Sequence, residues 1–328
     1  MANVLILGGT GWLSGRIATR WVDAGASVTC LARGAREAPH GARLVAADRA
    51  RPGAYDGVRH QEWDEIIDIS SQPIQVEQAV AALGGAARHW TYVSSFSVYA
   101  DNRTTGQDES AVLAEPLVDG EEYDYSRAKA ACEAAVRDAL GQGAAILRPG
   151  LIVGPGDPTD RFGYWVARFA LAGTEPVLIP EAPGASMQVI DVDDLADFAF
   201  AVGRDRWTGV VNTIGDALPL ADLLAFARSV AGHTGAVVAS EDDWLLDHEV
   251  GHWSGPRSLP LWLPSDMPGF ATRTNAAYRI AGGRLRRLGD TLERTLADER
   301  ERGLDRPRHA GLDRDDERAL IAASARSI

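Results

Sequence analysis

The sequence predicts a doubly wound α/β fold with a parallel sheet, followed by a smaller and mostly helical C-terminal lobe. Over the first 150 residues, short apolar runs alternate with amphipathic stretches, which is the pattern of strand and helix units in a parallel sheet. The first apolar run ends in a glycine-rich turn, "LILGGTGWLSG", where a helix begins. Beyond residue 150 a segment rich in Gly, Pro and Asp intervenes, and helical patterns then dominate.

Six strands are expected in the first 150 residues. They span residues 3–8, 27–33, 43–48, 64–70, 89–95 and 143–150. Helices are expected over residues 11–25, with Leu13, Ile17 and Trp21 on one face, and over residues 125–140. Sheets of this class bind ligands at the carboxyl ends of their strands, so the candidate site is expected at that edge.

The residues after 150 are expected to contribute to both the sheet domain and the second lobe. Residues 151–162 read as a loop, and residues 187–203 as a strand running into a helix capped by Asp191 or Asp193. We therefore assign residues 1–150 and 186–215 to the sheet domain, and residues 151–185 and 216–328 to the second lobe. Within that lobe, a helix over 164–172, a strand over 176–180 and helices over 219–232, 290–303 and 313–327 are expected.

Composition excludes several classes of protein. The chain has 328 residues, is 45% hydrophobic and 24% charged, and contains no run of about 20 apolar residues that could span a membrane. The net charge of −13 argues against a nucleic-acid-binding surface. Two distant cysteines, Cys30 and Cys132, and an N-terminus without a basic region indicate a reduced compartment and no signal peptide. We expect a cytoplasmic protein with no bound metal and no membrane partner.

The glycine turn after the first strand predicts a dinucleotide site. Gly8, Gly11 and a third small residue, Ser14, connect the first strand to the first helix. Glycines there let the backbone approach a pyrophosphate at the positive end of the helix. A tight turn without a ligand is the alternative. The turn residues expected to contact the cofactor are Gly8, Thr10, Gly11, Trp12 and Leu13, which makes the sheet domain the dinucleotide-binding domain and the second lobe the substrate lobe.

The end of the second strand indicates which dinucleotide binds. An acidic residue there would bind the ribose hydroxyls of NAD, whereas an arginine would accommodate the 2′-phosphate of NADP. The segment "TCLARGAR" contains Arg33 and Arg36 and no acidic residue, which favours NADP and leaves NAD possible. Asp48, after the third strand, is a candidate for contact with the adenine amino group, or a solvent-exposed loop residue.

Tyr125 and Lys129 form the most informative pair in the sequence. Of 33 basic side chains, 32 are arginine and one is Lys129. Residues four apart on a helix share a face, so the lysine ammonium is expected to lower the pKa of the tyrosine hydroxyl and to reach the cofactor ribose. The alternative is a surface charge retained by chance. Hydroxyls of Ser94, Ser95, Ser97 and Tyr99 follow the fifth strand, where one could hydrogen bond the oxygen that gains charge during hydride transfer.

Four motifs together resemble the short-chain dehydrogenase/reductase superfamily in its extended, NAD-dependent epimerase/dehydratase-like form, a Rossmann fold. They are "GGTGWLSG", "YVSSFSVYA", "YSRAK" and "LRPGLIVGPGD", in the expected order within residues 1–215. The resemblance implies that Tyr125 is the catalytic acid/base, that Lys129 activates it and binds the ribose, and that Ser95 is the third catalytic residue. It also implies that Arg148, Pro149 and Gly150 lie against the nicotinamide, and that the helix bearing Tyr125 can form a homodimer interface.

Three features depart from that family pattern. The third glycine is Ser14, which is expected to widen the packing of helix on strand. The acidic residue typical of NAD-using sugar epimerases is missing after the second strand, and "IIDISSQPIQ" lacks the His-x-Ala-Ala pattern of nucleotide-sugar enzymes. A nucleotide-sugar substrate is therefore in doubt.

The segment "HEVGH", His248 to His252, matches the H-E-x-x-H pattern of zinc proteases. That site needs both histidines on one face of a regular helix, but Gly251 and the following "WSGP" interrupt a helix. We expect a loop at the cleft instead, where His252, Trp253 and Trp262 shape a substrate pocket.

The leading functional prediction is an NAD(P)-dependent oxidoreductase that transfers a hydride between the nicotinamide and a small-molecule carbonyl or alcohol. The first alternative is an epimerase or dehydratase that returns the hydride to its substrate. Alternatives of other classes are a non-catalytic dinucleotide-binding or RNA-binding relative and a zinc protease.

Overall fold

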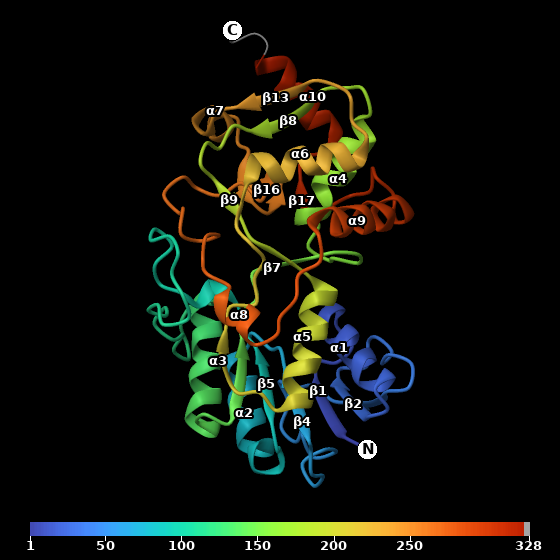
Figure 1. Ribbon diagram of the computed structural model, residues 1–328, viewed down its shortest axis with the longest axis vertical. Coiled ribbons are helices and arrows are strands. Elements are labelled where there is room, and N and C mark those ends of the chain that lie inside the picture. The colour runs from blue at the N-terminus through green and yellow to red at the C-terminus, as the bar shows by residue number, and fades with distance from the viewer. Residues whose placement is uncertain (325–328) are drawn as a thin grey trace.

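A seven-stranded parallel sheet forms the first lobe of the computed structural model, which describes residues 1–324 (Figure 1). The strand order is β11-β6-β5-β4-β1-β2-β3. The chain begins in the middle of the sheet at β1, winds outward through β2 and β3, and then crosses back to β4 on the other side of β1. The strands are β1 (Asn3–Leu7), β2 (Ser27–Ala32), β3 (Arg43–Ala46), β4 (Glu65–Asp68), β5 (Trp90–Val93), β6 (Ala144–Leu147) and β11 (Gly209–Val211).

Helices cover both faces of this sheet. One face carries α1 (Trp12–Asp23) and α5 (Val192–Asp205), and the other carries α2 (Pro73–Leu83) and α3 (Tyr125–Leu140) (Figure 1). The central strands β1, β4, β5 and β6 are almost completely buried because each face of the sheet packs into its own apolar cluster, whereas the edge strands β3 and β11 are partly exposed. The predicted doubly wound fold is confirmed. The loops between these elements include the short 3₁₀ helices η1 (Gly84–Ala86) and η2 (Phe96–Val98).

The six strands predicted in the first 150 residues are confirmed. Several other strands were not predicted, and two of them adjoin the sheet domain. The first is β11, which pairs with β6 at the edge of the sheet. The second is β7 (Leu151–Val153), in a segment expected to be a loop, which pairs in parallel with β10 (Val189–Asp191). The Asp191 side chain accepts a hydrogen bond from the Asp193 amide and caps α5. Asp191 is one of the two residues that the sequence predicted as this cap.

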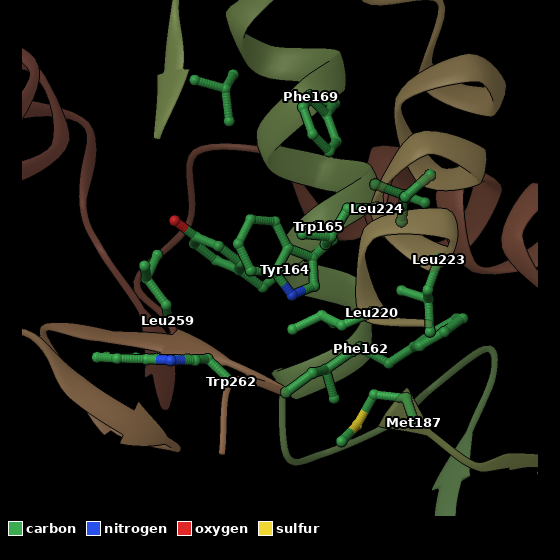
Figure 2. Close-up of a cluster of buried hydrophobic side chains, with 14 of the residues drawn as sticks. Phe162, Tyr164, Trp165, Phe169, Met187, Leu220, Leu223, Leu224, Leu259 and Trp262 are labelled. Atoms are coloured by element: carbon green, nitrogen blue, oxygen red, sulfur yellow. The ribbon is translucent and has the colours of Figure 1, made fainter. Parts of the chain in front are cut away.

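The second lobe is assembled around an aromatic helix, α4 (Arg161–Ala172). Phe162, Tyr164, Trp165 and Phe169 project from it into a cluster that also contains Trp262 (Figure 2). The indole Nε1 of Trp165 donates to the Pro260 carbonyl at 2.8 Å, which satisfies a polar atom that would be costly to bury alone. Within residues 1–324, no helix is both long and apolar enough to cross a bilayer.

The remaining elements of the second lobe are short strand pairs and helices. The strand pairs are β8 (Val177–Pro180) with β13 (Val237–Ser240), β9 (Ser186–Met187) with β12 (Leu218–Pro219), β14 (Gly251–Trp253) with β16 (Ser258–Pro260), and β15 (Gly255–Pro256) with β17 (Ala310–Gly311). The helices are α6 (Leu220–Ala231), α7 (Asp242–Asp247), α9 (Leu288–Arg302) and α10 (Arg314–Ser324). The predicted C-terminal helix extended to residue 327, and its last three residues lie outside the described part of the chain.

One segment of the C-terminal part packs on the first lobe. Helix α8 (Ala276–Ile280) places Tyr278 in the apolar cluster that contains α1 and α5. The Tyr278 ring meets Phe198 edge-on at 4.7 Å between centroids. Helix α8, which lies within the residues expected to form the second lobe, thus packs its apolar side chain on the sheet domain.

Helix α3 is attached to the sheet by a buried ion pair. Glu133 of α3 and Arg148, directly after β6, form a two-pronged interaction with N–O distances of 2.9 and 2.7 Å. Both side chains are 1% exposed. Burial alone would raise the pKa of Glu133, but the hydrogen bonds and charge of Arg148 outweigh it and hold this pKa below its usual value. The Arg148 guanidinium also donates to the Tyr99 hydroxyl at 2.8 Å.

We predict that Arg148→Met lowers the free energy of unfolding by about 3–5 kcal/mol, because it leaves the Glu133 carboxylate buried without its main partner. Urea denaturation measures this loss. The double variant Arg148→Met/Glu133→Leu removes both charges and should recover most of the stability. If Arg148→Met alone is as stable as the wild type, the ion pair between Glu133 and Arg148 does not stabilise the fold.

Candidate active site

A cavity of about 750 Å³ opens at the carboxyl ends of β1, β2 and β4. We call it the glycine-turn cavity. Its lining includes Gly8, Thr10, Gly11, Arg33, Arg36, Asp48 and Ser70. This is the edge at which the sequence placed the ligand, on both sides of the point where the strand order reverses between β1 and β4.

The glycine turn folds tightly over the end of β1. Gly8 has φ +83°, a left-handed conformation that side chains other than glycine adopt at a cost. At Gly9, an added Cβ would lie 2.5 Å from the Cys30 Sγ, so the turn packs directly against β2. Helix α1 begins at Trp12, one residue after Gly11, and its N-terminus therefore faces the cavity with the polarity that attracts a phosphate.

Ser14 strengthens this turn. Its hydroxyl donates to the Gly8 carbonyl at 2.6 Å and accepts from the Gly11 amide at 3.0 Å. Ser14 is completely buried, so the hydroxyl replaces a third glycine by filling the turn. The expected widening of the helix packing is therefore replaced by two hydrogen bonds that close it.

Two unpaired arginines stand at the far end of the glycine-turn cavity. Arg33 and Arg36 line it and are exposed, and among the described residues neither has an ion-pair partner. Asp48 also lines the cavity, where its carboxylate accepts from the Ala50 amide at 3.0 Å. Arg33, Arg36 and Asp48, which the sequence assigned to the adenosine half of the cofactor, thus line one cavity.

A second cavity of about 540 Å³ adjoins the first through Ile69, which lines both. We call it the tyrosine cavity. The predicted site residues that line it are Trp12, Leu13, Ser95, Tyr125, Lys129, Pro149 and Gly150. They come from α1, from the loop after β5, from α3 and from the loop after β6, so elements that are distant in sequence converge here. Asp124 caps α3 by accepting from the Arg127 amide at 2.8 Å, which fixes where Tyr125 begins the helix.

Tyr125 and Ser95 interact at the mouth of the tyrosine cavity. The Tyr125 residue is 46% exposed, but its hydroxyl is sheltered enough that desolvation is the largest effect on its pKa and raises it. A hydrogen bond with Ser95 and the positive charge of Arg161 act in the opposite direction. The Ser95 hydroxyl is itself oriented by the Ser97 amide, which donates to it at 3.1 Å.

Lys129 is buried beneath the cavity floor at 3% exposure. Its Nζ lies within hydrogen-bond distance of four oxygens: the carbonyls of Ile69, Ser70 and Val93 and the hydroxyl of Tyr92, at 3.3, 3.0, 2.8 and 3.2 Å. Desolvation lowers the pKa of Lys129 to about 8. The action of this ammonium on Tyr125 stays a prediction; among the effects on the Tyr125 pKa, a second cation, Arg161, acts to lower it.

Arg148 does not line either cavity. Its guanidinium is 1% exposed and is committed to Glu133 and Tyr99. The resemblance placed Arg148, Pro149 and Gly150 together against the nicotinamide, and the structure leaves only Pro149 and Gly150 at the cavity wall. Arg148 points away because its side chain closes the space between β6 and α3.

A model of the NAD-dependent epimerase/dehydratase family matches residues 4–214 of the chain. The chain belongs to this family. It is therefore an enzyme that depends on a nicotinamide dinucleotide, and the family resemblance drawn from the four motifs is confirmed. No curated protein matches the sequence.

Solved structures of the same fold include nucleotide-sugar epimerases. UDP-N-acetylglucosamine 4-epimerase from Bacillus cereus is 14% identical, with a TM-score of 0.68 over 95% of this chain and 100% of that one. UDP-glucuronic acid 4-epimerase from Bacillus cereus, solved with NAD, is 13% identical, with a TM-score of 0.67 over 91% and 99%. UDP-glucose 4-epimerase from Thermotoga maritima is 14% identical, with a TM-score of 0.67 over 92% and 99%. At this identity the likeness establishes the fold.

Sequence reasoning missed the part of the tyrosine cavity that the second lobe supplies. Arg161, Trp253, Phe270 and Thr159 line it, and none of them was predicted to touch Tyr125. Trp253 was expected near the substrate, together with His252 and Trp262, and only Trp253 reaches the cavity. Arg161 could have been noticed as the basic residue that follows the Gly- and Pro-rich run at the start of α4.

The H-E-x-x-H pattern does not form a metal-binding helix in this family member. Helix α7 ends at Asp247, so His248 lies beyond it, and His252 lies in strand β14. The His248 ring stacks on Trp244 and the His252 ring lies against Trp262, at centroid distances of 3.9 and 3.8 Å. The two imidazoles are thus held by different tryptophans.

We predict that Lys129 makes stability depend on pH. Because its pKa falls from 10.5 in the unfolded chain to about 8 in the folded one, folding carries a cost below pH 8 that disappears as the pH rises to 10.5. The free energy of unfolding of the wild type, minus that of Lys129→Met, should rise by about 3 kcal/mol across this window. Chemical denaturation at a series of pH values measures it, and a constant difference would contradict the burial of a charged ammonium.

Proposed function

We propose that the chain is an oxidoreductase that transfers a hydride between a nicotinamide dinucleotide and a carbonyl or alcohol carbon of a small molecule. The observation that carries this proposal is the convergence of Ser95, Tyr125 and Lys129 on one cavity. That cavity adjoins a second cavity with a glycine turn and a helix N-terminus. Together they offer a place for both halves of a dinucleotide.

The residues present fit such a cofactor. The backbone of Gly8, Thr10 and Gly11 would hold the pyrophosphate, since Gly8 has the left-handed conformation that brings the main chain close. Lys129 would donate to the nicotinamide ribose hydroxyls, and Pro149 and Gly150 would form the wall beside the ring. When bound, the cofactor accepts or supplies the hydride.

Tyr125 supplies the proton chemistry in this proposal. When an alcohol is oxidised, its carbon gives up a hydride and Tyr125 accepts the hydroxyl proton, which leaves a carbonyl; in the reverse direction Tyr125 returns that proton. The Ser95 hydroxyl donates a hydrogen bond to the substrate oxygen while charge develops on it. The raised pKa of Tyr125 suits the protonated form that reduction of a carbonyl requires.

An epimerase or dehydratase is the second candidate, and membership of the epimerase/dehydratase family favours it. The solved relatives described above act on UDP-sugars by their names. In that case Tyr125 would serve the same step, but the hydride would return to the substrate. Absorbance of the reduced cofactor separates the candidates, because it changes during net oxidation or reduction and does not change in an epimerase.

We further propose a cytoplasmic homodimer. Both cysteines are free and buried, as in a reducing compartment, and the family resemblance places a dimer interface on the helix that bears Tyr125. Light scattering of the purified protein measures the mass: about twice the 35.1 kDa of one chain supports the dimer, and one chain mass contradicts it.

We predict that NADPH binds more tightly than NADH, because Arg33 and Arg36 are free to pair with a 2′-phosphate at the far end of the glycine-turn cavity. One Arg–phosphate contact contributes about 1.5–3 kcal/mol, so Arg33→Ala should weaken NADPH binding at least tenfold and leave NADH binding nearly unchanged. Fluorescence titration measures both affinities, and Arg204→Ala, on the outer face of α5, is the matched control. Tighter binding of NADH, the cofactor type found in a solved relative, would assign the protein to NAD.

We predict that Tyr125→Phe lowers kcat by about 10²–10⁴-fold, the range that one acid/base group contributes, while the dinucleotide affinity remains close to that of the wild type. The substitution removes one hydroxyl from a partly exposed ring, so the fold should persist. Steady-state kinetics with a panel of aldehydes and alcohols, together with cofactor titration, measures both quantities. Turnover at the wild-type rate would remove Tyr125 from its role.

A further inference from the structure

An arginine without an ionic partner lies on the substrate side of the tyrosine cavity. Arg161 lines this cavity together with Tyr125 and Ser95. Its one hydrogen bond runs from Nε to the Thr159 hydroxyl at 3.2 Å, and no carboxylate within residues 1–324 lies at ion-pair distance from it. The terminal nitrogens of the guanidinium, which carry most of its donors, are therefore available to a ligand.

The loop before α4 holds this arginine in place. Asp157 is buried at 3% exposure and accepts hydrogen bonds from both the amide and the hydroxyl of Thr159, at 2.8 and 3.0 Å. Thr159 in turn accepts from Arg161. The neighbouring Asp160 is committed to the second lobe, where it pairs with Arg302 and Arg306. The acidic residues closest in sequence thus make their hydrogen bonds and ion pairs elsewhere, and neither forms an ion pair with Arg161.

Arg161 stacks on one aromatic ring of an apolar cluster at the cavity wall. Its guanidinium lies over the Trp253 ring at 4.9 Å. Trp253 packs edge-on against Phe270 at 5.6 Å, and Phe270 packs against Phe96 at 4.5 Å. Trp253 has φ +66°, a strained conformation for a bulky residue that is more common at ligand sites than elsewhere.

The charge on this side of the cavity matches a single negative charge. Lys129 and Arg161 are the two cationic residues of the lining, and the Lys129 ammonium already faces backbone carbonyls and, in the proposed function, the cofactor ribose. Desolvation lowers the pKa of Arg161, while Asp157 and Tyr125 act in the opposite direction. A partly buried cation without an ion pair is costly, and a guanidinium edge binds a carboxylate through two parallel hydrogen bonds.

We propose that Arg161 is a specificity-determining residue that binds a carboxylate of the substrate, whose apolar body packs against Trp253 and Phe270. The inference rests on the proposed function and names its substrate class: a carbonyl or alcohol compound that carries one carboxylate and an apolar group. The guanidinium then positions the substrate so that its reacting oxygen reaches Ser95 and Tyr125. A diphosphate would bring more negative charge than the one free cation of this cavity can balance.

Calorimetric titration of the cofactor-bound protein with benzoate and its neutral isostere benzamide tests this proposal. One charge-assisted contact contributes about 1.5–3 kcal/mol, so the wild type should bind benzoate at least about tenfold more tightly than benzamide. In Arg161→Gln, benzoate should bind only as well as benzamide, and benzamide affinity should not change. Arg161→Lys keeps the charge without the planar fork and should retain part of the preference.

Arg204→Gln is the matched control, because Arg204 lies on the outer face of α5 and pairs with Asp205; it should keep the full benzoate preference. Equal binding of benzoate and benzamide by the wild type, absence of benzoate binding, or a preference that survives in Arg161→Gln would overturn the proposal. So would binding of UDP that requires Arg161, because the anion would then be a diphosphate. Dinucleotide binding is measured on the same samples: its absence refutes the proposed function, whereas its presence without a benzoate preference refutes only the role of Arg161.

Discussion

The position of α3 on the sheet depends on two buried charges, and the tyrosine cavity depends on α3. Glu133 pairs with Arg148 at the end of β6, and Lys129, one turn earlier, lies among carbonyls at the ends of β4 and β5. Buried charges such as those of Glu133 and Lys129 are stable only when polar partners lie within hydrogen-bond distance. These contacts therefore fix the register of α3 against the sheet. Tyr125 is one further turn along the same helix, and its place beside Ser95 follows from that register.

The second lobe completes the site through a loop and one strained residue. The run from Asp157 to Arg161 crosses from the sheet domain to α4; within it Asp157 holds Thr159, and Thr159 holds Arg161. Trp253 approaches the same space from β14, more than ninety residues later in the chain. In the proposed function, the sheet domain supplies the reacting groups, while the second lobe supplies the groups that would distinguish one substrate from another. A family can therefore keep one chemistry while its members differ in substrate, because the two tasks lie on different parts of the chain.

The sequence allowed prediction where local rules decide the outcome. The strands of the sheet, the glycine turn and the Tyr125–Lys129 spacing follow from periodicity and turn chemistry over a few residues. The seventh strand, β11, was missed because three residues at a sheet edge give too short a pattern. The partners of Arg148 and the aromatic cluster beside Arg161 could not be predicted, because they depend on contacts between residues far apart in sequence. Ser14 replaces the third glycine of the motif, and the sequence predicted that it would widen the packing of helix on strand. Its hydroxyl instead closes the turn through two hydrogen bonds.

The surroundings of Lys129 explain why this position holds the single lysine of the chain and not an arginine. The buried arginines Arg148 and Arg49 each meet a carboxylate with two parallel hydrogen bonds, which is the geometry that a planar guanidinium suits. Lys129 instead meets carbonyl and hydroxyl oxygens that converge on one point from β4 and β5, and a compact ammonium with three donors suits that arrangement. None of those oxygens carries a negative charge, so desolvation is not balanced and the lysine pKa falls to about 8. The same imbalance leaves the ammonium attractive to further oxygen ligands, such as the ribose hydroxyls of a dinucleotide.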